Sequence, residues 1–135
     1  MFIDAQQLFS DAQALTATAV STNVIDLGAD RNIGIGNPMA VVVQIDVALD
    51  GTTTDETYVV TVQSGSTATP TAVIATRTIT YTEGVAGARF VIPLPADASA
   101  DRYLRVNYTL GGTTPTGTVT TFLMPMNMID SGNIK

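Results

Sequence analysis

The segment from Asp101 to Met124 constrains the fold more strongly than any other part of the chain. Its first part alternates between two kinds of residue, and one set is apolar or aromatic: Leu104, Val106, Tyr108 and Leu110. This period of two predicts a strand with one buried face. Glycine and proline break the pattern over residues 111–117, and β-branched and aromatic residues return over 118–123. We therefore expect a hairpin with a loop of about seven residues. A lone hairpin is not stable in water, so the preceding chain must supply an opposing sheet.

Alternation recurs upstream, over residues 23–27, 39–49, 57–64, 73–81 and 88–94. The longest of these patterns runs over 39–49, where one face carries Val41, Val43, Ile45, Val47 and Leu49. We expect that face to point into the core. The opposite face is apolar only at its start, and we expect another element to cover it there.

Composition supports the same fold class. The chain has 22 threonines, 45% apolar and 13% charged residues, and very little Glu or Lys, which favours strands over helices. Pro93 lacks a ladder donor and predicts either an edge strand or the end of a strand. We expect one all-β domain, an antiparallel two-sheet β-sandwich or jelly roll of seven or eight strands.

The N-terminal residues are the exception. Ala5, Leu8, Phe9 and Ala12 follow helix-like spacing, and the threonines at 16 and 18 oppose a long helix. We expect a short N-terminal helix or arm over residues 1–20, the sandwich over 21–130 and a tail over 131–135.

Charge and hydropathy exclude several kinds of partner. Six basic and twelve acidic residues give a net charge of −6, and the basic ones are scattered. Binding to phosphate backbones needs a concentrated cationic face, which argues against nucleic acid and anionic membranes as partners. The first residues lack the features of a signal peptide, and the longest apolar runs, such as Met39–Val43, are too short to span a membrane. We expect a soluble protein that folds where it is made.

The chain contains no Cys and no His. This excludes disulfides, Ser–His–Asp and Cys–His catalytic groups and imidazole metal sites. Carboxylate pairs remain, among Asp50, Asp55 and Glu56 or between Asp97 and Asp101, but glycoside hydrolysis also needs a cleft with stacking aromatics, and Trp is absent. Residues 50–56 lack the spacing of a calcium loop, and the glycines at 34 and 36 lack the third glycine of a dinucleotide motif. We expect neither enzymatic activity nor a cofactor.

Three groups of residues are candidates for contacts with partners. The first is apolar and lies in the N-terminal segment, where it either packs back onto the domain or docks on a neighbour: Phe2, Ile3, Leu8 and Phe9. The second combines arginine and tyrosine, which are common interface anchors, although an ordinary solvent face with Arg105 paired to an acid is the alternative: Arg102, Tyr103 and Arg105. The third is Met126 and Met128, since methionine fills cores or adapts to partners.

Three segments together resemble a known family: FSDAQALTATAVSTNVIDLG at Phe9–Gly28, RNIGIG at Arg31–Gly36, and RYLRVNYTLGG…TGTVTTFL at Arg102–Leu123. They are similar to small capsid cement (decoration) proteins of tailed bacteriophages. The resemblance implies a jelly-roll sandwich that self-associates as a dimer. It also implies binding to the major capsid protein on the outer surface of the virion, after synthesis in the bacterial cytoplasm. It carries over no binding residues.

The working hypothesis places the shell contact on an arm at Phe2–Ala14 and one hairpin edge. The same hypothesis assigns self-association to the Arg102–Tyr108 strand or to the methionine-rich end at Met126 and Met128. Exposed apolar residues and an unpaired sheet edge motivate this division. A carbohydrate- or receptor-binding sandwich of a phage tail fibre is the alternative function, and a pilus-like surface subunit is a third.

Overall fold

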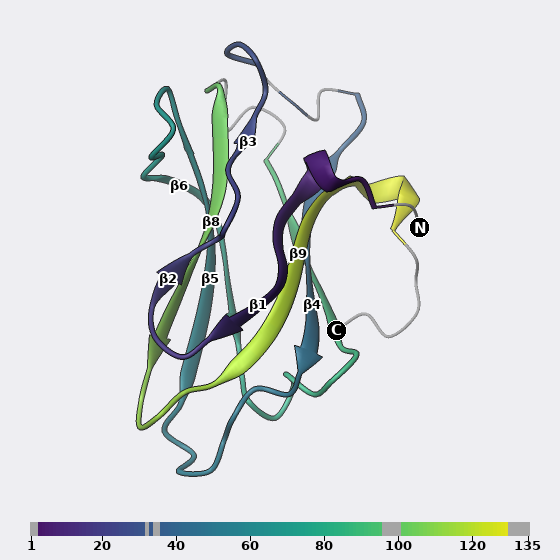
Figure 1. Cartoon of the computed structure of the whole chain (residues 1–135). Helices are drawn as coiled ribbons and strands as arrows, with labels where there is room; N and C mark the ends of the chain where they lie inside the picture. The colour runs from purple at the N-terminus through teal and green to yellow at the C-terminus, as the bar shows by residue number, and fades with distance from the viewer. Residues whose placement is uncertain (1–2, 32, 34–35, 96–100, 130–135) are drawn as a thin grey trace.

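The computed structural model describes residues 3–31, 33, 36–95 and 101–129, and this part of the chain forms two antiparallel sheets packed face to face (Figure 1). Sheet A contains, in spatial order, β1 (Leu8–Leu15), β9 (Gly117–Pro125), β4 (Met39–Val47) and β7 (Arg89–Pro93). Sheet B contains β2 (Ala19–Val20), β8 (Tyr103–Gly111), β5 (Thr57–Gly65) and β6 (Ala72–Ile79), and β3 (Ile25–Asp26) also pairs with β8. Two short 3₁₀ helices, η1 (Ala5–Gln7) and η2 (Met126–Met128), flank sheet A. Within the described ranges, neither helix is long or apolar enough to cross a membrane.

The strand order is that of a jelly roll. Both β2 and β3 pair with β8, so they occupy one position between them. The chain then pairs from the outside inwards: β1 with β9, β2 and β3 with β8, β4 with β7, and β5 with β6. This nested pairing, divided between two sheets, defines the jelly roll. The all-β sandwich predicted from the sequence is confirmed.

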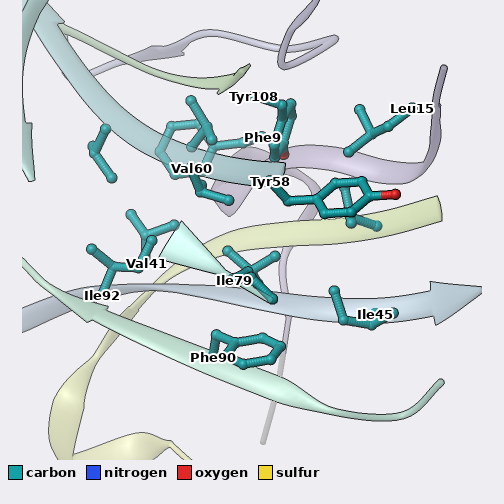
Figure 2. Close-up of a cluster of buried hydrophobic side chains, with 14 of the residues drawn as sticks. Phe9, Leu15, Val41, Ile45, Tyr58, Val60, Ile79, Phe90, Ile92 and Tyr108 are labelled. Carbon is teal, nitrogen blue, oxygen red and sulfur yellow. The ribbon is translucent and has the colours of Figure 1, made fainter. Parts of the chain in front are cut away.

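One core lies between the sheets, and Figure 2 shows side chains from both sheets meeting in it. Val41, Val43 and Ile45 of β4 point into this core, as predicted. Val47 does not follow them and is 58% exposed, because the pairing of β4 with β9 shifts register between Ile45 and Val47. Leu49 lies beyond the strand and is again buried.

A second apolar cluster lies on the opposite face of sheet A. Val42, Phe122 and Met124 are fully buried there, and Leu8 and Ile129 pack against them. The sequence predicted that another element would cover the apolar start of this face. Leu8 and Ile129, near the two ends of the described chain, provide part of this covering layer.

The hairpin predicted for Asp101–Met124 is wrong. Both strands exist, as β8 and β9, but β8 pairs with β5 in sheet B and β9 pairs with β4 in sheet A. Their connection therefore crosses from one sheet to the other. Asp55 holds the crossing in place, because its carboxylate accepts hydrogen bonds from the backbone N–H and the hydroxyl of Thr113 at 3.1 and 3.0 Å. Positive φ angles at Gly112 (91°) and Thr114 (53°) complete the corner.

The predicted N-terminal helix or arm is also wrong for residues 8–15, which form β1, an edge strand of sheet A. Only Ala5–Gln7 is helical. β1 contains two register shifts, between Leu8 and Ser10 and between Ser10 and Gln13. Phe9 and Ser10 are consequently both buried, so the strand does not alternate, and its apolar spacing resembles that of a helix. The predicted tail at 131–135 lies outside the described residues.

A buried hydroxyl network joins the two sheets. The Tyr108 hydroxyl of β8 donates to Thr121 Oγ1 of β9 at 2.7 Å and lies 2.8 Å from Ser10 Oγ of β1. Ser10 Oγ also donates to the side-chain carbonyl of Gln13 at 2.6 Å. Burial raises the pKa of Tyr108 to about 12, so the phenol keeps its proton. All three hydroxyls are therefore satisfied inside the core.

Replacing Tyr108 with Phe will lower the free energy of unfolding by about 1–3 kcal/mol, because it removes the shared partner of two buried hydroxyls. Tyr103→Phe is the matched control, since Tyr103 lies half-buried on the outer face of sheet B, and it should change stability by less than about 0.5 kcal/mol. Urea titrations of the three proteins measure both values. Equal stability of Tyr108→Phe and the original chain would contradict a structural role for the network.

The bulge in β1 generates a second prediction. Ala12 has a φ of 45°, in the left-handed region, which costs a non-glycine residue about 1 kcal/mol. Ala12→Gly relieves this strain and should leave stability unchanged or raise it. Ala14→Gly, at an exposed position of the same strand, should destabilise by roughly 0.5–1 kcal/mol because glycine gains more freedom in the unfolded chain. Thermal unfolding of both variants tests the difference, and an equal loss in both would argue against strain at Ala12.

Candidate interaction surfaces

Apolar residues from both ends of the described chain meet on one open surface beside sheet A. Ile3, before η1, and Met128, in η2, line a groove of about 480 Å³ together with Asp4, Gln6 and Gln7. Ile3 is 45% exposed and Met128 50%. We call these five residues the terminal groove. Sequence reasoning treated Ile3 and the methionines as separate candidates, and the fold brings Ile3 and Met128 together.

Local hydrogen bonds fix the two walls of the terminal groove. Asp4 caps η1 by accepting from the Gln6 N–H at 2.9 Å, while the Gln7 side chain accepts from the Asp4 N–H at 3.1 Å. This reciprocal capping box holds the turn that carries Ile3. On the other wall, the Met126 N–H donates to the Pro38 carbonyl at 2.8 Å and fixes the start of η2. Sequence reasoning missed the polar members of the groove, although an acid followed three residues later by glutamine is a recognisable capping signal.

Phe9 and Leu8, two other N-terminal candidates, pack within the domain and do not line the terminal groove. Phe9 is fully buried in the core between the sheets, and Leu8 packs against the second apolar cluster. Both therefore pack back onto the domain, which was one of the two alternatives for the arm. Phe2 lies outside the described residues. Met126 is 40% exposed and lies in η2, the short helix that also carries Met128.

Arg102 lies at the end of sheet B where β3 joins β8, and its partner is Asp26. The guanidinium makes a two-pronged ion pair, with Nε–Oδ1 at 2.7 Å and an Nη–Oδ2 hydrogen bond at 2.8 Å. It also lies over the Tyr103 ring, 5.0 Å from the ring centroid. The hydrogen bond from Arg102, with a second from the Gly28 N–H, lowers the pKa of Asp26 to about 2. The predicted arginine–tyrosine patch thus exists, but Arg102 is already engaged within the chain.

Arg105 lies further along β8 and shares the outer face of sheet B with Tyr103. Its Nε donates to the side-chain carbonyl of Gln63 on β5 at 2.8 Å. The sequence alternative gave Arg105 an acidic partner, whereas the acid–arginine pair of this surface is formed by Asp26 and Arg102. Sequence reasoning missed Asp26 because only the pairing of β3 with β8 places it beside Arg102.

The ion pair predicts a pH dependence. Because the folded pKa of Asp26 lies near 2, below its ordinary 3.8, the pair's contribution to stability is fully present above pH ~4 and is lost as the pH falls through ~2. The stability difference between the original chain and Asp26→Asn should therefore shrink from pH 5 to pH 2. Carbon-13 NMR titration of the Asp26 carboxyl measures the midpoint directly. Arg102→Gln should move that midpoint upwards, and an unmoved midpoint would contradict the assigned cause.

The acidic loop at residues 50–56 is organised by threonine rather than by a metal site. Asp50 accepts from the Thr52 N–H at 3.1 Å, and Glu56 accepts from the Thr53 N–H at 3.2 Å. Hydrogen bonds from the Thr53 hydroxyl and from Thr113 lower the pKa of Asp55. Among the residues that the structure describes, no three acidic, His or Cys side chains are grouped so as to hold a metal ion. The loop caps itself and anchors the corner between β8 and β9.

Comparison with known proteins identifies a family. A family model named Bbp16 matches residues 9–123, which include every strand from β2 to β8 and most of β1 and β9. No match was found among the curated proteins compared with the chain. The match supports the phage-related part of the sequence resemblance and carries no statement about capsids. Because it covers most of the chain, the protein belongs to the phage-related Bbp16 family.

Proposed function

We propose that this protein is a capsid cement protein. It binds the outer surface of an icosahedral phage shell, contacts the major capsid protein, and joins neighbouring shell subunits. In this proposal it self-associates as a dimer and needs neither a cofactor nor catalysis. The family match supports a phage setting, and the full sequence lacks the His and Cys residues of most catalytic groups.

The observation that carries the proposal is the terminal groove with its exposed apolar rim. Ile3, Met126 and Met128 expose 40–50% of their surface on a chain whose other large apolar residues mostly lie in two buried clusters. Exposed apolar surface that gathers at one site marks a contact with another macromolecule. Methionine suits such a contact because its unbranched side chain adapts to the partner's shape. The terminal groove and Met126 replace the Phe2–Ala14 arm as the proposed shell contact.

Weak individual contacts are sufficient for this role. A dimer that holds two shell subunits gains through effective concentration, by roughly 10²–10⁴-fold over one contact. A protein that binds the assembled shell and not its separate subunits stabilises the shell by mass action. The sandwich suits this role because long-range strand pairing holds both of its sheets together.

The alternative function, carbohydrate or receptor binding in a phage tail fibre, would need an accessible aromatic side chain, and the outer face of sheet B supports it poorly. Tyr103 is the aromatic candidate there, but it is half-buried and the Arg102 guanidinium lies over its ring, 5.0 Å from the centroid. Stacking of a sugar on Tyr103 would have to displace this contact from the covered face. Stabilisation of the capsid shell is therefore favoured over sugar binding.

Co-sedimentation with shells of the same phage that lack the protein tests the proposal. The purified chain should bind saturably, at a fixed ratio to the major capsid protein, and should raise the thermal stability of the shell. Met126→Ser/Met128→Ser should weaken binding at least about tenfold, which corresponds to the loss of about 1.4 kcal/mol of apolar contact. Shells before and after expansion report whether maturation creates the binding site.

Val47→Ser/Val85→Ser is the matched control, because these valines are 58% and 46% exposed but lie outside the terminal groove. It should bind like the original chain. Absence of binding to either form of the shell would refute the proposed function. Equal weakening by both double variants would refute the terminal groove as the contact site.

A further inference from the structure

The sandwich has four sheet edges, and three of them carry features that prevent another strand from adding to them. β1 has two register shifts and the left-handed Ala12. β7 is an edge strand of five residues that ends at Pro93, in agreement with the predicted edge or strand end, and β2 and β3 are two residues each. Bulges, proline and short length are the usual means by which soluble proteins block edge pairing. The fourth edge, β6, is different.

β6 is eight residues long and contains no proline. Its one register shift lies near its start, between the pairs Val62–Ala75 and Gln63–Val73, so Ala75–Ile79 pairs regularly with β5. Six of its eight side chains are exposed or half-exposed and uncharged, and Val73 is 56% exposed. An edge of this kind offers a regular template to an incoming strand.

The direction of the backbone groups on β6 follows from two hydrogen bonds between Ser21 and Val106 on the other side of sheet B. The Ser21 N–H donates to the Val106 carbonyl at 2.7 Å, and the Val106 N–H donates to Ser21 Oγ at 3.1 Å, so the backbone of Val106 faces away from β5. The backbone N–H and C=O groups of successive residues in a strand point to opposite neighbours. Those of Asn107 therefore point to β5, towards its register partner Thr61.

The same alternation carries across β5 to β6. Since the backbone of Thr61 faces β8, that of its other register partner, Thr76, faces away from β5. Thr78 follows by the same period of two. The N–H and C=O groups of Thr76 and Thr78 therefore point to the open edge, while those of Arg77 are used in the ladder with β5.

The charge on β6 is turned away from this edge. The Arg77 side chain reaches across to sheet A, where it donates to the Val91 carbonyl at 3.2 Å and lies 5.1 Å from the centroid of the Phe90 ring. The remaining side chains of β6 are Ala, Val, Ile and Thr. Antiparallel pairing of two β6 strands centred on Thr76 or on Thr78 would place Arg77 opposite Ala75 or Ile79, so that no like charges oppose each other. A threonine then lies opposite the same threonine of the second copy, a favourable cross-strand pair.

We propose that β6 is a strand-addition site for a second copy of this chain. Two β6 strands pair antiparallel about a two-fold axis, and the two B sheets continue as one. A two-fold interface must complement itself, and the regularly paired part of β6 does so, because its outward-facing backbone groups alternate and its one charge, on Arg77, is held against sheet A. The inference rests on the proposed function, because it assigns a surface to the self-association proposed there. The experiments below contain no capsid shell. Failure of the β6 interface and failure of the shell-binding proposal can therefore be distinguished.

Sedimentation equilibrium of the purified chain gives the first test. The expected mass is twice the 14.1 kDa of one chain. Two double variants place charge on the edge, Thr76→Lys/Thr78→Lys and Thr76→Glu/Thr78→Glu, and each should sediment as a monomer because like charges then oppose each other. A mixture of the two should return to the dimer mass. Thr109→Lys is the control, because Thr109 is exposed on β8 in the middle of sheet B, and this variant should stay a dimer.

Hydrogen exchange of the unaltered chain provides a measurement that needs no variant to fold. The amides of Thr76 and Thr78 should exchange more slowly as protein concentration rises, since pairing protects them. A monomer at every concentration would overturn the inference. So would a dimer that tolerates charge at both edge positions, or one that Thr109→Lys disrupts equally, since the latter places the interface on the face of sheet B.

Discussion

The hydrogen bonds between Tyr108 and the hydroxyls of Ser10 and Thr121 set how the two sheets of this sandwich face each other. Apolar packing is non-directional, so the valines and isoleucines of the core tolerate small displacements of one sheet over the other. The hydroxyl network does not, because a displaced Tyr108 would leave buried polar groups without partners. One phenol thereby ties β8 to both β1 and β9.

Alternation along single strands predicted the fold class and the inward faces of β5 and β8, because burial on one face of a pleated strand repeats every second residue. It failed where strands are irregular. In β1 the two register shifts bury adjacent residues, Phe9 and Ser10, and the resulting spacing resembles a helix. In β4 a shift turns Val47 outwards. Alternation also describes only the faces of a strand and not its neighbours, so it did not show that β8 and β9 lie in different sheets.

For the candidate surfaces, too, the sequence predicted some features and missed others. That Ile3 and Met128 were worth attention could be judged from their apolar character near the chain ends, but their meeting in one groove depends on β1 lying beside β9. Arg102 was recognised as a possible contact, yet its partner Asp26 is 76 residues away and only strand pairing brings them together. Local sequence identified residues of the right chemistry, and the long-range topology decided which of them are free to act.

The position of β9 has a consequence for how the protein comes into being. β9 lies between β1 and β4, and its Thr120 side chain accepts from the Ala12 N–H across 108 residues of chain. A ribosome delivers the chain from its N-terminus, so the edges of β1 and β4 that pair with β9 stay unpaired until β9 emerges. Sheet A is then completed in a late, slow step, as expected for contacts so distant in sequence. Until synthesis has passed residue 125, the nascent chain therefore exposes two strand edges to which another chain could pair.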